Sequence, residues 1–105
     1  MALTRSFKDR ITARIENDPA FAAALLAEAV EAMLSGDLDT GKAVLRDHIN
    51  ASIGFDRLSE RTGTPPKSLM RMFSHAGNPN ACNLFRVIAA LQAECGVSLE
   101  LRDAA

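Results

Sequence analysis

Apolar residues recur every three or four positions along most of this chain, which is the spacing of one face of an α-helix. Glycines, prolines and capping residues interrupt that spacing and divide it into segments. The segments predict helices over residues 6–17, 19–34, 38–53, 55–62, 65–74 and 79–95. We therefore expect an all-α fold, a bundle of five to six helices.

The ends of several predicted helices carry capping residues. Asp18 and Asp37 are suited to be N-caps, and Pro19 follows Asp18 at a first helical position, where proline is favoured. In the same way, Asn78 predicts the start of the last helix. Gly41 lies inside a helix, where glycine costs about 1 kcal/mol relative to alanine, and close helix packing would explain it.

Each predicted helix has an inner apolar face. On the N-terminal helix, which is expected to start at Ser6, Phe7, Ile11 and Ile15 form a narrow stripe that can dock on the core or on a second copy of the chain. The wider faces of the other helices, which we expect to be buried, are formed by Phe21, Leu25, Leu26, Ala29, Val30, Met33, Leu38, Val44, Leu45, Ile49, Ile53, Leu58, Leu69, Met70, Met72, Leu84, Phe85, Ile88 and Leu91.

Beyond Gly96 the pattern changes, because Val97, Leu99 and Leu101 alternate with polar residues, as in a strand. A single strand in a helical domain has no partner in its own chain, so we expect a C-terminal strand that pairs across a homodimer. The chain is thus divided into an N-terminal helix or arm (1–18), a helical domain (19–96), and a C-terminal strand and tail (97–105).

The composition agrees with one helical domain. The chain has 105 residues, of which 48% are hydrophobic. Its net charge is −1, so it has no overall basic signature, but the charges are unevenly distributed. Residues 19–41 carry four acidic side chains and no Lys or Arg, whereas residues 42–75 carry six basic and three acidic side chains.

The positive excess coincides with a segment, residues 57–77, that has the pattern of a helix-turn-helix. Two short helices flank a turn at Gly63. The second helix is expected to open at Pro65, with Thr64 as its cap. In such a unit the second helix enters a groove of DNA.

Several polar side chains of this segment are candidates for contacts with DNA. Lys67 and Arg71 lie four residues apart and share a helix face, so we expect them to reach base edges. Ser68 and Thr64 are candidates for phosphates. Further phosphate contacts are predicted for Arg57, Arg61 and Lys42. The alternative is that all these charges merely cover a solvated helix face.

An ordered set of short motifs resembles the antitoxins of the HigA-like, Xre-type helix-turn-helix class, the addiction-module antidote proteins. The motifs are Gly36-Asp37, Leu45-Arg46, Leu58-Ser59 with Gly63, Ser68 through Ser74, Gly77-Asn78-Pro79, and Leu84 with Val87-Ile88 and Ala90-Leu91. The match covers roughly residues 19–101. It implies a lambda-repressor-like fold, a homodimer that represses its own operon by binding double-stranded operator DNA, and a small toxin as partner.

The resemblance also carries site residues onto this chain. Base contacts in that class come from the start of the recognition helix, which corresponds here to Pro65, Pro66, Lys67 and Arg71, with Ser68 beside them. Prolines have no side-chain donor, so direct readout would rest on Lys67 and Arg71. The competing hypothesis is a helical protein–protein interaction module that has lost DNA binding.

Other classes of function find little support in the sequence. His48, His75, Cys82 and Cys95 are scattered singly, so no metal site is predicted, and both cysteines are expected to be free, buried thiols. His48 is expected to be a satisfied, semi-buried side chain. No pair of acids and no glycine-rich phosphate loop indicates an enzyme or a cofactor. No stretch approaches the length of a membrane span, and we expect a cytoplasmic protein.

Overall fold

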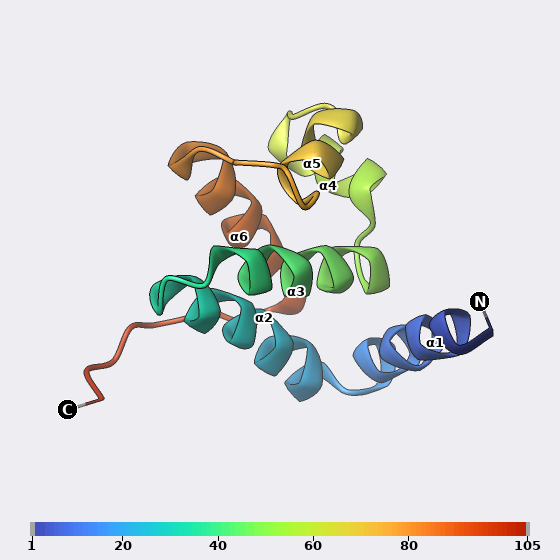
Figure 1. Cartoon of the computed structure of the whole chain (residues 1–105). Helices are drawn as coiled ribbons and strands as arrows, with labels where there is room; N and C mark the ends of the chain where they lie inside the picture. Colours follow the sequence, from blue (N-terminus) through green and yellow to red (C-terminus); the bar gives the residue numbers. More distant parts are fainter. Residues whose placement is uncertain (1, 105) are drawn as a thin grey trace.

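The computed structural model describes residues 2–104, and for residues 2–6 and 8 it describes the backbone only. The described chain is built from six helices (Figure 1): α1 (Ala2–Asn17), α2 (Pro19–Leu34), α3 (Leu38–Ala51), α4 (Phe55–Thr62), α5 (Pro66–Met72) and α6 (Ala81–Cys95). No strand occurs between residues 2 and 104. The predicted all-α fold is confirmed.

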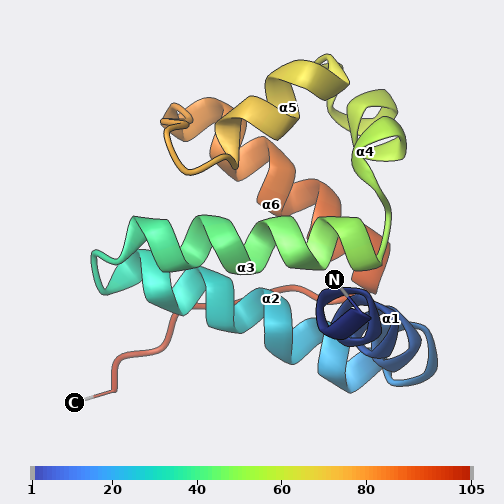
Figure 2. The same ribbon diagram turned by 45° about the vertical axis from the view of Figure 1, so that its right-hand side comes forward.

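The antiparallel pair α2 and α3 forms the base of the molecule, with α4, α5 and α6 above it and α1 at one end (Figures 1 and 2). Both predicted caps are present, because Asp18 Oδ1 accepts from the Phe21 N–H and Asp37 Oδ1 from the Thr40 N–H, each at 3.2 Å. Gly41 explains the closeness of the pair. A Cβ there would lie 3.0 Å from the Ala29 carbonyl oxygen, and closer still to Met33 Cγ.

The core lies between the α2–α3 pair and the helices above it. Its fully buried side chains come from α2, α3, α4, α5, α6 and the turn after α5, and they include Leu26, Leu45, Ile49, Leu58, Leu69, Phe73, Val87 and Leu91. Because α4 and α5 are each shorter than three turns, they owe their stability to this burial more than to helix propensity.

Several predicted helix ends are wrong by a few residues. The first helix begins at Ala2, so Ser6 lies inside it, and the Ser6 side chain lies outside the described residues. The third helix ends at Ala51 rather than at residue 53. The last helix is capped by Asn80, whose Oδ1 accepts from the Asn83 N–H at 2.8 Å, and not by Asn78.

The start of α5 also differs from its prediction, for a reason that lies in the two prolines. The ring of Pro66 forces the residue before it out of the helical region, and Pro65 accordingly has ψ = 145°. Pro65 is therefore the N-cap position and Pro66 the first helical residue. Thr64 does not cap the helix; its N–H donates to Thr62 Oγ1 at 3.3 Å.

Three side chains that were expected to be buried lie at the surface. Phe85 is 64% exposed and Met70 48% exposed, and Cys82 is exposed as well. Phe85 lies beside the buried stripe of α6, which is formed by Val87, Ile88 and Leu91, rather than within it. Met70 lies on the outer face of α5.

The C-terminal tail has no regular structure between residues 97 and 104 and passes behind α2 in the view of Figure 1. Two backbone amides hold its first part, since the Val97 N–H donates to the Gln92 carbonyl oxygen at 3.1 Å and the Leu99 N–H to Gln92 Oε1 at 2.7 Å. The expected strand does not form in the single chain, because no second strand lies beside it; its pairing across a dimer stays a prediction.

Candidate nucleic-acid interface

The helices α4 and α5 meet at a tight turn built on Gly63. This residue has φ = 76°, a left-handed conformation that favours glycine, and its N–H donates to the Ser59 carbonyl oxygen at 2.8 Å. Leu58 on α4 and Leu69 on α5 are both fully buried and fix the two helices to the core. The expected turn glycine and the two apolar anchors are confirmed.

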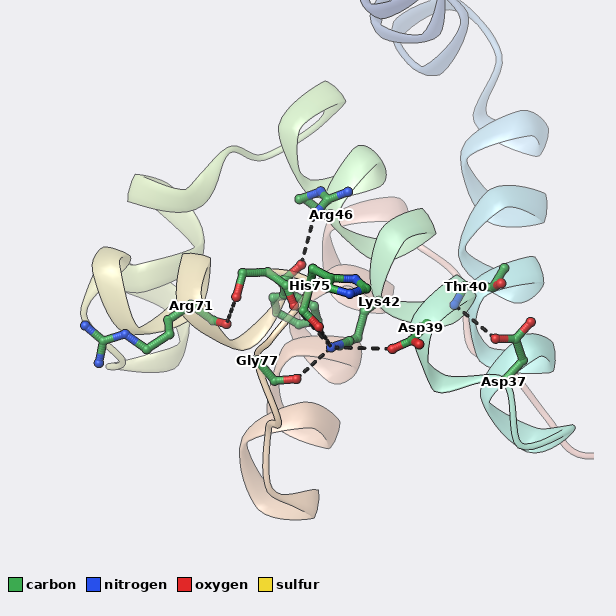
Figure 3. A network of polar contacts seen from close by, with 10 residues as sticks. Asp37, Asp39, Thr40, Lys42, Arg46, Arg71, His75 and Gly77 are labelled. Carbon is green, nitrogen blue, oxygen red and sulfur yellow. Dashed lines mark hydrogen bonds and ion pairs between the residues drawn. The ribbon is translucent and has the colours of Figure 1, made fainter.

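The outer face of α5 carries two cations with nothing to neutralise them. Lys67 and Arg71 are both exposed, and within the described part of the chain neither the Lys67 ammonium nor the Arg71 guanidinium has a hydrogen-bond or ion-pair partner. The Arg71 guanidinium points away from the polar network behind it (Figure 3). Ser68, on the same helix, is half-buried.

The far end of α5 is anchored by a buried lysine from α3. Lys42 is 4% exposed, and its Nζ donates to the carbonyl oxygens of Ser74 (3.1 Å), His75 (3.2 Å) and Gly77 (2.6 Å), as Figure 3 shows. Positive charge at the C-terminal end of a helix also complements its dipole. Lys42 is therefore a structural residue, and its predicted contact with phosphate is wrong.

A second cation of α3 supports the same end of α5. Arg46 Nη1 donates to the Phe73 carbonyl oxygen at 3.2 Å. Sequence reasoning missed both anchors, because the bonds join residues 27–35 positions apart and no local pattern records them.

The turn that follows α5 depends on a close backbone approach at Gly77. A Cβ at this position would lie 2.6 Å from the Met72 carbonyl oxygen, and closer still to that of Arg71. Only glycine fits there without displacing the end of α5.

The two arginines of α4 are engaged with α6. Arg61 Nη2 lies 3.0 Å from Glu94 Oε2, and Arg57 Nη2 lies 3.8 Å from Glu94 Oε1. Their side chains remain 42% and 60% exposed, so each ion pair contributes little to stability. The predicted cations of α4 and α5 thus separate into two groups: the Lys67 and Arg71 side chains are free, whereas Arg57 and Arg61 share one carboxylate.

The closest approach to a nucleophile–base pair is Cys95 with His48, which lie 3.6 Å apart (Sγ to Nε2). His48 is fully buried, and Nε2 also faces the Ala22 carbonyl oxygen at 3.2 Å, so this nitrogen carries the proton and cannot accept one. Burial lowers the pKa of His48, and burial together with the Glu94 carboxylate raises the pKa of Cys95. Both groups are therefore neutral at neutral pH. Both ring nitrogens of His48 have hydrogen-bond partners, as predicted, but the side chain is fully buried rather than semi-buried.

Within residues 2–104, no three His, Cys, Asp or Glu side chains converge as a metal site would require. Nor is any helix of this part of the chain both long and apolar enough to cross a membrane.

We compared the chain with protein-family models, with curated proteins and with solved structures, and none of the three comparisons finds a match.

Proposed function

We propose that this protein is a DNA-binding transcriptional regulator of the antitoxin type, in which α4, the Gly63 turn and α5 act as a helix-turn-helix. One observation carries the proposal. Lys67 and Arg71 project without partners from a short helix that is fixed by Leu69 and by the Lys42 anchor. A rigid element with unpaired cations is what recognition of base edges in the major groove requires.

The chemistry of α5 defines what it reads. The Arg71 guanidinium and the Lys67 ammonium are donors suited to the O6 and N7 acceptors of guanine. Pro65 and Pro66 offer apolar contact to a thymine methyl group. We further propose that the hydroxyl groups of Thr64 and Ser68 donate to phosphates near the helix start.

The electrostatic part of the affinity is small. Because Lys67 and Arg71 are assigned to base edges, few cations are left to neutralise phosphates, and log K should depend only weakly on the salt concentration. Contacts of Arg57 and Arg61 with phosphates would make the affinity more salt-dependent, but Glu94 pairs with both of them.

The antitoxin part of the proposal rests on the resemblance of the motifs, and a surface charge supports it. Glu28 and Glu31 on α2 and Asp37 after it are exposed, and we propose this acidic stretch of the chain as a contact for a basic toxin. Co-purification of this chain with the product of the neighbouring reading frame tests that partnership. Failure to co-purify would leave a regulator without a toxin.

Gel retardation of the DNA upstream of the gene tests DNA binding. The double variant Lys67→Ala plus Arg71→Ala should raise the dissociation constant by about 30-fold or more, since each base contact contributes about 1–3 kcal/mol. The control is Arg10→Ala plus Arg86→Ala, which removes two exposed arginines from α1 and α6 and should retain binding.

Two results would contradict the proposal: unchanged retardation in the Lys67/Arg71 variant, or no retardation by the native protein at low salt. The second result would favour the alternative, a helical module for protein–protein interaction.

A further inference from the structure

An apolar groove lies away from α5, where α2, α6 and the tail meet. It has a volume of about 640 Å³. Three of its lining residues, Leu34, Phe85 and Leu101, are 62%, 64% and 80% exposed, more than any other large apolar side chain of the described chain. Exposed apolar residues gathered on one surface are typical of an interaction site.

The tail that borders this groove has one engaged edge and one free edge. The amides of Val97 and Leu99 bond to Gln92 of α6. In an extended chain the backbone groups of successive residues point to opposite edges. The N–H and C=O groups of Ser98 and Glu100 have no hydrogen-bond partner in the described part of the chain, and in an extended tail they would face the other edge.

We propose that a second copy of this chain docks here, and that the two tails pair antiparallel about a two-fold axis at Leu99. The pairing would supply the missing hydrogen bonds of both free edges, and it would extend the apolar surface of each groove across the interface. The inference rests on the proposed function in so far as it names the interface of the dimeric regulator.

The side chains of the tail select this register. With the axis at Leu99, Leu99 of one copy faces Leu99 of the other, and Val97 of each copy faces Leu101 of the other. Every pair on the inner side is therefore apolar. An axis at Glu100 would place two carboxylates opposite each other, and like charges so placed are destabilising. An axis at Leu101 would place Leu99 opposite the charged Asp103.

Charge complementarity supports the same register. It places Arg102 of one copy opposite Gly96 of the other, which is the residue at the C-terminal end of α6. That end has no basic residue in its last turn. An arginine from the second copy would complement the negative end of the helix dipole.

Disulfide cross-linking of the full chain tests the register. In a background of Cys82→Ser and Cys95→Ala, Leu99→Cys should give a covalent dimer on mild oxidation, because residues facing each other across the axis have Cβ atoms about 5 Å apart. The matched variant Leu101→Cys should not, since its two copies would lie about 14 Å apart along the strands. Equal cross-linking of both variants, or of neither, would overturn the proposed register.

Light scattering tests the interface itself. The native chain should have twice the 11.3 kDa mass of one copy, and Glu100→Pro, which removes an amide from the free edge, should lower the mass to that of one copy. The control Ala104→Pro lies beyond the paired residues and should stay dimeric. A monomeric native chain, or a dimeric Glu100→Pro variant, would overturn the proposal.

Neither experiment uses DNA, so the two proposals can fail separately. If the native chain is a monomer that still retards operator DNA, the proposed interface is refuted and the proposed function is retained. A cross-linked dimer that binds no DNA would do the reverse.

Discussion

Replacing Lys42 by methionine tests how much the hydrogen bonds of its ammonium group contribute to stability. Methionine keeps most of the apolar stem of this buried side chain but removes its ammonium group. Three carbonyl oxygens, those of Ser74, His75 and Gly77, then lose their donor at once. We expect Lys42→Met to destabilise the protein although it leaves the hydrophobic core intact.

The magnitude follows from those three contacts. A hydrogen bond from a charged donor contributes about 1.5–3 kcal/mol. Water reaches the half-exposed turn and replaces part of each lost bond, and removal of a buried charge recovers some desolvation energy. The ion pair with Asp39 is long, at 3.9 Å, and Asp39 is largely exposed, so it adds less than about 1 kcal/mol. The net loss should be about 2–3 kcal/mol, or about 10–20 °C in Tm.

Urea denaturation followed by far-ultraviolet circular dichroism measures this loss, since the chain has no Trp or Tyr for fluorescence. Arg46→Met is the matched control, because it removes a single bond of 3.2 Å from the same helix. Arg46 is half-buried, so water replaces part of this bond and the loss should be only about 1 kcal/mol. If Lys42→Met cost no more than Arg46→Met, the anchor would not hold α5 and the reasoning would be wrong.

Two further substitutions probe the same fold. Gly77→Ala should lower the free energy of unfolding by more than about 3 kcal/mol in urea denaturation, because the added Cβ meets the backbone of α5. The control Gly36→Ala, at φ = 92° in open space, should lower it by only about 1 kcal/mol. Similar losses in the two variants would argue against a tight contact at Gly77. Burial lowers the pKa of His48 below its ordinary 6.5, so the unfolded chain binds a proton that the folded chain excludes, and stability should fall as the pH drops below about 6.5. His48→Gln should flatten this slope in urea titrations at several pH values; an unchanged slope in His48→Gln would contradict the assignment.

Local patterns in the sequence predicted the helices well, because the information lies within a few residues. The caps at Asp18 and Asp37 and the turn at Gly63 follow from side-chain and backbone preferences of single residues. The start of α5 was misjudged although its cause is also local: the effect of Pro66 on Pro65 outweighs the capping tendency of Thr64.

The candidate site was harder to predict, because its charges are sorted by contacts between distant segments. In the sequence, Lys42, Arg57, Arg61, Lys67 and Arg71 are equivalent cations. In the fold, one is buried under the end of α5, two share Glu94, and two remain free. Periodicity cannot express such differences, since each depends on which helix lies opposite.

The hydrogen bonds of Lys42 also imply an order of events during folding. The α2–α3 pair joins neighbouring helices through a short turn, so it closes a small loop, whereas the bonds from Lys42 close loops of 32 to 35 residues. During synthesis the first pair can therefore form while the segment that follows is still being made. The α5 helix reaches its final position only after its own C-terminal turn has emerged from the ribosome.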